Sequence, residues 1–263
     1  MKKISLVLCI LLLIIFTFSL TSCKLNDYVN IKSLHFQYNG MHFWLIGHKE
    51  ENEKDDYFMA GDLLDKDVVN YFIPMTIRGY PVREFGFARF TNPSAGSIFL
   101  KDKSLRRLYM PGTITGPGGD YEYFEGVHKK MQVYYCGNTI DMYCIYSYGS
   151  EVSYYVPADR IDEFVDALGT TTPIGAECGL YKANIAYRLN AEDMCEYYYV
   201  DNVEAGLRIV NIPPKPTRKG YKFDGWYTEK ECINKWDFYK APAVSDNDDN
   251  FVEFSLYAKW IKK

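Results

Sequence analysis

Regular alternation of apolar and polar residues marks the last third of the chain. Every second residue is apolar in two segments, from Ala183 to Leu189 and from Val252 to Trp260. A period of two over this length predicts strands with one face buried in a core. The C-terminal part of the chain is therefore expected to form a small sheet.

The segment between these strands carries aromatic residues whose spacing requires a break in the strand. Tyr221 and Phe223 share one face, whereas Trp226 would point to the other. One extra residue at Asp224-Gly225, a β-bulge, would return Trp226 to the first face, and glycine suits the backbone of a bulge. We then expect these rings to pack in one small core with Leu256 and Trp260. Each buried ring contributes roughly 1.5–3 kcal/mol.

A helix is predicted between Pro157 and Gly169. Its apolar residues fall at helical spacing on one face, namely Ile161, Phe164, Val165 and Leu168. We expect Asp159 to cap its first turn, Gly169 to end it, and the acidic residues of the opposite face to lie in water. Residues 170–181 then form a linker between two regions.

Residues 31–169 are predicted to form short strands and turns. Pro74 prevents a helix from running through this region, and Gly79-Tyr80-Pro81 is typical of a turn. Apolar residues flank that turn on both sides, namely Ile77, Val82, Phe85, Ala88 and Phe90.

Phrases in this region resemble BspA-type leucine-rich repeats. The matching positions are Ile73-Pro74, Gly79, Val82 to Gly86, Ala88 with Phe90, Leu105, Leu108, Met110-Pro111 and Tyr154 to Ala158. Pro74 and Pro111 lie 37 residues apart, which exceeds the usual repeat of about 20–29 residues. The resemblance therefore implies a short, irregular array that flanking strands would have to cap, since each repeat leaves an apolar face open.

The C-terminal segment resembles the Listeria–Bacteroides repeat, also called the internalin B-repeat, over about residues 182–261. Its first phrase is matched by Pro213, Pro216, Arg218, Gly220, Tyr221, Phe223, Gly225, Trp226 and Tyr227. Its later phrases are matched by Trp236-Asp237-Phe238 and by Leu256-Tyr257-Ala258-Lys259-Trp260. The resemblance implies a β-grasp-like fold with one short helical connection, in a surface-exposed module that often accompanies leucine-rich repeats. A single copy excludes a long repetitive stalk.

Composition supports a β-rich (α+β) fold, and the two resemblances imply a short, irregular leucine-rich-repeat-like β region followed by a small β-grasp-like domain. The 263 residues include 24 Tyr and 16 Phe, and aromatic residues favour strands. The tyrosines are compatible either with recognition of a partner or with filling small β cores. The net charge is −4 without a long basic patch, so nucleic acid is not expected as a partner.

The N-terminal segment points to export. Lys2 and Lys3 precede an apolar run from residue 4 to 20, which ends in Leu20-Thr21-Ser22-Cys23. These four residues look like a lipobox. The resemblance implies that residues 1–22 are a signal peptide and that Cys23 carries lipid, followed by a tether over residues 23–30. The alternative is an uncleaved membrane anchor, since the run is near the lower limit for spanning. Both place the remaining chain outside the cell, and the first anchors it to the outer face of a bacterial membrane.

Five cysteines remain beyond Cys23, namely Cys136, Cys144, Cys178, Cys195 and Cys232. An odd number cannot all pair internally. Local bridges between Cys136 and Cys144 and between Cys178 and Cys195 are plausible in an oxidising compartment, and free, partly buried thiols are equally plausible.

No motif for catalysis, cofactor binding or metal binding is recognised. The four histidines, His35, His42, His48 and His128, have no ligand spacing. The glycine-rich stretch 112–119 lacks the Lys-Ser/Thr of a P-loop. Residues 246–250 begin like a calcium loop, but Phe251 replaces the required glycine. We therefore expect no catalytic residues, no cofactor and no metal.

The leading hypothesis is a non-catalytic cell-surface lipoprotein that binds membrane lipid through Cys23 and an extracellular protein or glycan through its β region. It rests on family analogy. Two alternatives remain: a structural spacer or envelope-complex subunit, and a polysaccharide-active enzyme whose paired carboxylates the sequence cannot reveal.

Overall fold

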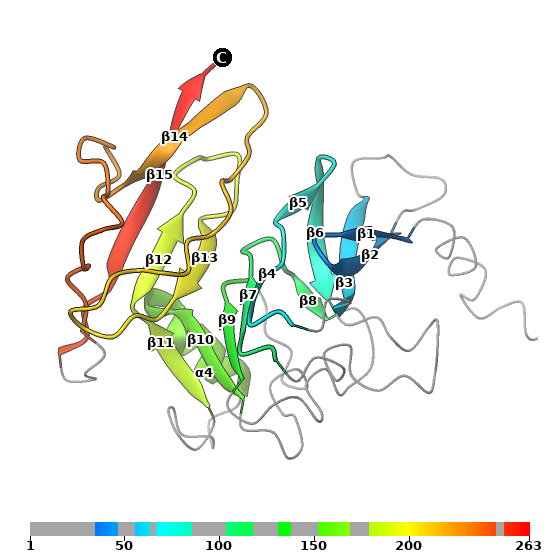
Figure 1. The fold of residues 1–263 in the computed structure, drawn as a ribbon, viewed down its shortest axis with the longest axis horizontal. Coiled ribbons are helices and arrows are strands. Elements are labelled where there is room, and N and C mark those ends of the chain that lie inside the picture. Colours follow the sequence, from blue (N-terminus) through cyan, green and yellow to red (C-terminus); the bar gives the residue numbers. More distant parts are fainter. Residues whose placement is uncertain are drawn as a thin grey trace, which may run out of the picture.

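The computed structural model describes residues 35–46, 56–63, 67–85, 104–117, 131–137, 152–168, 179–245 and 250–263. The predicted signal peptide, Cys23 and the tether lie outside the described residues, as do Cys144, Cys178, His48 and His128. The described strands form three sheets (Figure 1). The prediction of a β-rich fold is therefore confirmed.

The first sheet, called here the N-terminal sheet, has the strand order β1-β2-β3-β6-β5, and β8 also pairs with β6. Its strands are β1 (His35–Tyr38), β2 (Met41–Ile46), β3 (Tyr57–Leu63), β5 (Thr76–Ile77), β6 (Tyr80–Phe85) and β8 (Gly116–Pro117). The β5–β6 turn is Arg78-Gly79, with φ values of 51° and 90°, as two-residue hairpins require. The predicted turn at 79–81 was thus placed too late, because Pro81 already lies in β6.

The second sheet is entirely parallel, and its strand order follows the chain. This parallel sheet consists of β4 (Asn70–Phe72), β7 (Arg107–Met110), β9 (Gln132–Tyr135), β10 (Ser153–Pro157) and β11 (Leu180–Ala183). The paired positions are 37, 25, 21 and 26 residues apart, at Tyr71, Leu108, Val133, Tyr154 and Leu180. Each turn of chain therefore adds one strand beside the last, as in a solenoid.

Strand β11 changes the boundary expected between the two regions. The linker was predicted over residues 170–181, but Leu180 and Tyr181 pair with β10 as part of the parallel sheet. Of the predicted linker, only residues 179–181 are described. The last strand of one region therefore leads into the next almost without a break.

The predicted helix is present as a short 3-10 turn, η3 (Ala158–Arg160), followed by α4 (Ile161–Leu168). Ile161 and Phe164 are buried and Val165 packs against the same core, while the acidic residues Asp162 and Glu163 are exposed. The first turn has no side-chain cap. Asp159 instead accepts hydrogen bonds from the C-terminal region, which the capping prediction missed.

The third sheet, the C-terminal sheet, has the order β13-β12-β15-β14. Its strands are β12 (Ile185–Arg188), β13 (Tyr197–Asp201), β14 (Tyr221–Tyr227) and β15 (Phe254–Lys262). β12 and β15 run parallel in the centre, and the outer pairs are antiparallel. Residues 202–220, which link β13 to β14, contain no helix, and no α-helix occurs in the described part of 228–253. The expected helical connection is therefore not found there.

The parallel sheet is buried on both faces. One face, including Leu108 and Val133, packs with α4 and the N-terminal sheet in one core. The other, including Tyr109 and Tyr134, packs with β12 and β13 in a second core (Figure 1). Parallel sheets generally need cover on both sides, and here two different neighbours provide it.

Candidate functional site

The β14 strand contains the predicted bulge. The register with β15 shifts between Phe223, which lies opposite Trp260, and Gly225, which lies opposite Lys259. Trp226 consequently turns to the same side as Phe223, and the two ring centroids are 5.3 Å apart. Gly225 has φ 142°, and an added Cβ would meet the Lys235 side chain at 2.6 Å.

The other motif positions named from the sequence also contribute to the fold of the C-terminal sheet. Leu256 and Tyr227 are buried, and Tyr257 lies opposite Tyr227 in the β14–β15 pair. The Trp260 indole N–H donates to the carbonyl of Leu189 at 2.7 Å. The carbonyl of Gly220, at a φ of 79°, accepts from the Lys263 N–H. The motif residues therefore form the core of the C-terminal sheet and the backbone contacts at its margins.

Tyr221 is a half-buried motif residue that contacts the turn before β14. The Arg218 guanidinium lies 3.9 Å from the centroid of its ring and 5.9 Å from that of Trp260. Arg218 also forms a bidentate pair with Asp193, with N–O distances of 2.6 and 3.3 Å. These contacts hold the turn before β14 against the β12–β13 loop.

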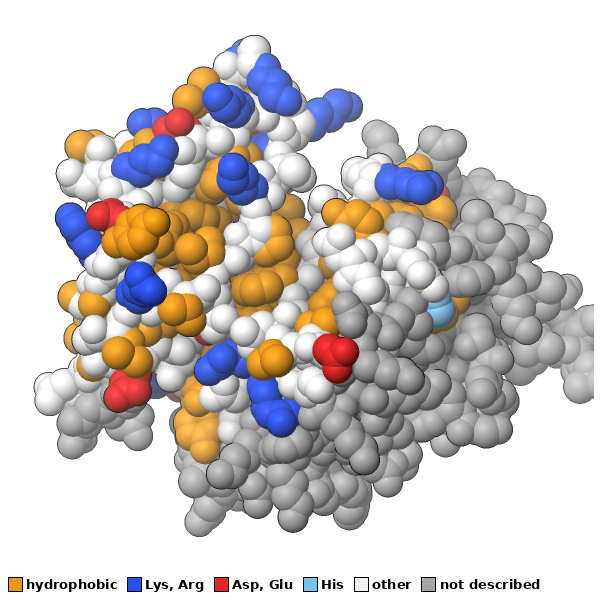
Figure 2. Space-filling view, in the orientation of Figure 1, with side chains coloured by type: hydrophobic (Ala, Val, Ile, Leu, Met, Phe, Trp, Pro, Cys, Tyr) orange, Lys and Arg blue, Asp and Glu red, His pale blue; other side chains and the backbone are white. Residues whose placement is uncertain are grey.

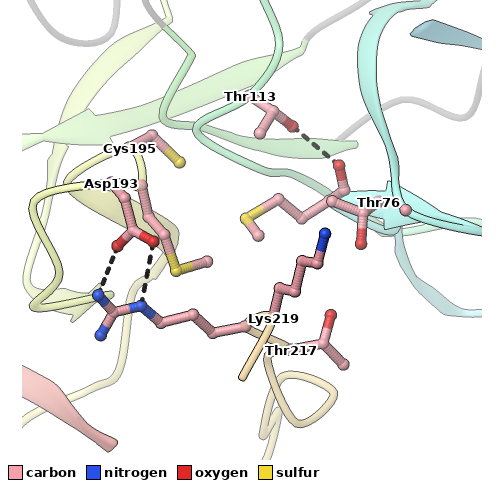
Figure 3. Close-up of a pocket in the computed structure, with 10 residues that line it drawn as sticks. Thr76, Thr113, Asp193, Cys195, Thr217 and Lys219 are labelled. Carbon is pink, nitrogen blue, oxygen red and sulfur yellow. Dashed lines mark hydrogen bonds and ion pairs between the residues drawn. The ribbon is translucent and has the colours of Figure 1, made fainter. Parts of the chain in front are cut away.

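That turn borders a cleft of about 620 Å³, called here the junction cleft, between the β5–β6 hairpin and the C-terminal sheet (Figure 3). The lining residues are Met75, Thr76, Gly79, Thr113, Asp193, Met194, Cys195, Thr217, Arg218 and Lys219. In Figure 3 the Lys219 side chain extends from its turn toward Thr76 across the space. A volume of this size lies within the range of small-ligand and side-chain pockets.

Charge in the junction cleft is not balanced. Its described lining contains one carboxylate, Asp193, which is already paired with Arg218. Lys219 is exposed and forms no ion pair with any described residue. The cleft consequently carries one uncompensated positive charge above walls that include Met75 and Met194.

Two features characterise this region. The β14–β15 pair contains the bulge and the aromatic residues, and it lies in a sheet whose four strands, numbered in chain order, are arranged 2-1-4-3. Residues 184–259 match the model of the Listeria–Bacteroides repeat domain. This is a surface-associated repeat domain. The match begins directly after β11, so the C-terminal sheet is the repeat domain and the parallel sheet precedes it.

The repeat domain is joined to the parallel sheet through β13, all of whose residues are buried. The Tyr199 hydroxyl donates to the Ile73 carbonyl at 2.5 Å, and the Tyr109 hydroxyl donates to Asp201 at 3.0 Å. The Tyr197 hydroxyl and Arg188 both donate to Asp159 of η3. These contacts join the repeat domain to the parallel sheet, and the contact at Ile73 lies on the segment that leads into β5.

Asp201 is a buried acid at this joint. Burial raises its pKa to about 7, and its Oδ2 atom finds no hydrogen-bond partner among the described residues. The nearby Tyr187 hydroxyl is also without a partner in the described part of the chain. Both groups lie inside the core, so they affect stability and not the cleft.

The cysteines that the structure describes are free thiols. Cys136 is buried and its Sγ donates to the Met110 carbonyl at 3.2 Å. Cys195 lines the cleft, and burial raises its pKa to about 11, which keeps the thiol protonated at neutral pH. Cys136 and Cys195 therefore follow the alternative of free, partly buried thiols, and their suggested partners Cys144 and Cys178 lie outside the described residues.

The sequence singled out Gly79, Cys195 and Arg218 for other reasons but did not predict the cleft, because its lining comes from four separate segments that only the fold brings together. In the described residues no cluster of three or more His, Cys, Asp or Glu side chains could hold a metal ion. Within the same part of the chain, no helix is long and apolar enough to cross a membrane. Many tyrosines, among them Tyr109, Tyr134 and Tyr187, are buried, so core filling accounts for them and presentation to a partner does not.

Proposed function

We propose that this chain is a lipoprotein, anchored by Cys23 to the outer face of a bacterial membrane, that binds an extracellular partner in the junction cleft. The observation that supports binding is the cleft itself, whose walls come from both the β5–β6 hairpin and the repeat domain. A domain that acted only as a spacer would need no such shared recess. The surface-associated character of the repeat domain supports placement outside the cell.

The parallel sheet is proposed to be a short leucine-rich-repeat-like solenoid. Its strands follow the chain order, and three of its four intervals, 25, 21 and 26 residues, agree with a repeat of about 20–29 residues. The longer first interval spans the β5–β6 hairpin, which contributes one wall of the junction cleft. The irregular insertion is therefore the part that we assign to binding.

Binding is proposed to occur without covalent chemistry. The sulfur nucleophile in the cleft is the Cys195 thiol, and its raised pKa leaves little thiolate at neutral pH. The one carboxylate in the described lining, Asp193, is held by Arg218. These groups position the walls of the cleft and supply neither an acid–base pair nor an activated nucleophile.

The anchor is tested by metabolic labelling with an alkyne-tagged fatty acid. The wild-type protein should be labelled and remain with the membrane fraction, and Cys23→Ala should be unlabelled because the acceptor sulfur is gone. Label that persists in Cys23→Ala would contradict lipidation at this residue.

The cleft is tested on arrays of extracellular proteins and glycans with the purified chain from residue 24 onward. Thr217→Trp should abolish the signal because the indole fills the mouth of the cleft, whereas Lys240→Trp adds the same ring at an exposed loop position outside the lining. Equal binding by both variants would remove the cleft from the proposal. Turnover of an arrayed glycan would favour the enzyme alternative.

A further inference from the structure

We propose that the occupant of the junction cleft is an extended, acidic peptide segment of a partner protein, with a carboxylate on Lys219 and an apolar side chain against Met75 and Met194. This inference rests on the proposed binding function of the cleft. It is argued from the backbone of β5, the charge of the cleft and the nature of its walls.

The backbone of Thr76 offers hydrogen bonds at the edge of the N-terminal sheet. β5 is the last strand in the order β1-β2-β3-β6-β5. The Val82 N–H donates to the Met75 carbonyl at 2.9 Å, so Met75 and Val82 are a hydrogen-bonded pair. In antiparallel ladders such pairs alternate with pairs whose backbone groups face away from the partner strand. The N–H and C=O of Thr76 therefore face away from β6, and Thr76 lines the cleft.

One residue of an extended peptide can meet both of these groups. Addition of a peptide strand to a sheet edge draws its affinity from main-chain hydrogen bonds, while pockets beside the edge select side chains. The N–H and C=O of Thr76 are spaced as in any strand, so they match the C=O and N–H of a peptide backbone better than the hydroxyl groups of a sugar ring. This geometry is the reason that we choose a peptide as the occupant.

The charge of the cleft selects an acidic side chain. Arg218 is engaged by Asp193 and by the Tyr221 ring, so Lys219 is the available cation of the lining. Figure 2 shows Lys and Arg side chains gathered over the β14–β15 end of the molecule, next to the indentation beside the β5–β6 hairpin. Lys222 and Lys262 are exposed at that end, and their field would steer an acidic partner toward the cleft.

The walls select an apolar neighbour for that acidic residue. Met75 belongs to the core beneath the repeat domain, and Met194 packs against the same core. Methionine side chains adapt to irregular shapes and are frequent in surfaces that accept several apolar side chains. The cleft is thus suited to an Asp or Glu adjacent to a Leu, Ile, Met or Phe.

The test is selection of a phage library of random 12-residue peptides on the purified chain from residue 24 onward. Wild type should enrich peptides with Asp or Glu beside a large apolar residue, and Thr217→Trp should lose them. For a selected peptide, Lys219→Glu should weaken binding by about tenfold or more, which corresponds to ~1.4 kcal/mol. Lys240→Glu makes the same charge change at an exposed position outside the lining and should alter the dissociation constant far less.

Three results would overturn the peptide assignment. Peptides that depend on the open cleft but carry no acidic residue would leave the binding function standing and refute the ligand class. An acidic oligosaccharide that binds in place of any peptide, and is lost in Lys219→Glu, would do the same. Absence of any peptide sensitive to Thr217→Trp would refute the inference, while the protein and glycan arrays decide separately on the binding function.

Discussion

Aromatic rings pack in two different ways in the parallel sheet and in the repeat domain. In the parallel sheet they stack face to face across strands, from Phe72 through Tyr109, Tyr134 and Tyr155 to Tyr181, with centroids 4.0, 4.6, 5.0 and 5.4 Å apart. In the repeat domain Trp226 meets Tyr187 and Phe223 edge to face around one bulge.

One difference is that Phe223 and Trp226 lie on the same strand, whereas each step of the stacked ladder joins two strands. Each step of the stacked ladder joins segments that are separated by 21 to 37 residues along the chain. The bulge fixes Phe223 and Trp226 within one strand, so the residue types and their spacing are constrained together. The repeat domain therefore has a compact sequence motif, whereas the parallel sheet has only a loose pattern of aromatic residues.

The largest effect is expected from Trp226→Ala. Trp226 is buried between Tyr187, Tyr198 and Phe223, and removal of a buried indole costs about 3–5 kcal/mol. Because β13 joins the repeat domain to the parallel sheet, we expect both regions to lose stability in one transition. Guanidinium denaturation followed by far-UV circular dichroism measures this.

The control for Trp226→Ala is Ile233→Ala, whose side chain is 75% exposed and should change the free energy of unfolding by less than about 0.5 kcal/mol. A biphasic curve, with the parallel sheet intact after the repeat domain has unfolded, would show that the two regions are independent.

The next effect concerns the acid at the joint. The pKa of Asp201 is raised to about 7 from a usual value of 3.8, so the protonated form favours the fold. Its stabilising contribution is complete below about pH 4 and is lost as pH rises through 7. Asp201→Asn should therefore be more stable than wild type at pH 8, by at most a few kcal/mol, since one pKa unit is worth ~1.4 kcal/mol.

Thermal unfolding of Asp201→Asn between pH 4 and pH 8 provides the measurement, and its stability should depend less on pH than that of wild type. Asp162→Asn, which changes an exposed carboxylate of α4, serves as the matched control and should follow the wild-type curve. A parallel pH dependence for Asp201→Asn and wild type would contradict the buried-acid interpretation.

A smaller loss is expected from Gly225→Ala at the bulge. Its φ of 142° is strained for an alanine, and the new Cβ would meet the Lys235 side chain at 2.6 Å. We expect a loss of about 1–3 kcal/mol in urea denaturation. Gly220→Ala has a φ of 79° but nothing within 4 Å of the new Cβ, so it should cost less, and equal losses would mean that contact with Lys235 is unimportant.

The smallest effect is expected from Tyr199→Phe. The Tyr199 hydroxyl is buried and donates to the Ile73 carbonyl, so its removal should cost about 1 kcal/mol without disturbing the stacked ladder. Tyr239→Phe, at an 86% exposed side chain, should have no measurable effect in the same denaturation experiment. A neutral Tyr199→Phe would mean that apolar packing alone holds the joint.

Several local features could be predicted because their causes are local. The spacing of Phe223 and Trp226 required the bulge, and the 3.6-residue period placed Ile161 and Phe164 on one helix face. Other features depended on distant partners. Asp159 lies at a position that favours capping, but Arg188 and the Tyr197 hydroxyl, which come from the repeat domain, engage its carboxylate instead.

The junction cleft illustrates the same limit for the candidate site. Thr76 and Lys219 are more than a hundred residues apart and belong to no motif. Nothing in either segment indicates that a hairpin inserted before the second solenoid strand would face the turn before β14. The lining residues with a sequence signal include Arg218, which belongs to the repeat pattern, and Gly79, which belongs to the predicted turn.

The sequence by itself determined the strand-rich class, the repeat domain and its bulged core, because alternation, glycine and aromatic spacing act over a few residues. Only the tertiary structure decided that β11 completes a five-stranded parallel sheet, that tyrosines of that sheet lie beneath the repeat domain, and that a charged cleft opens between the β5–β6 hairpin and the repeat domain. Those outcomes depend on burying two faces of one sheet at once, and that requirement is satisfied by residues far apart in the chain.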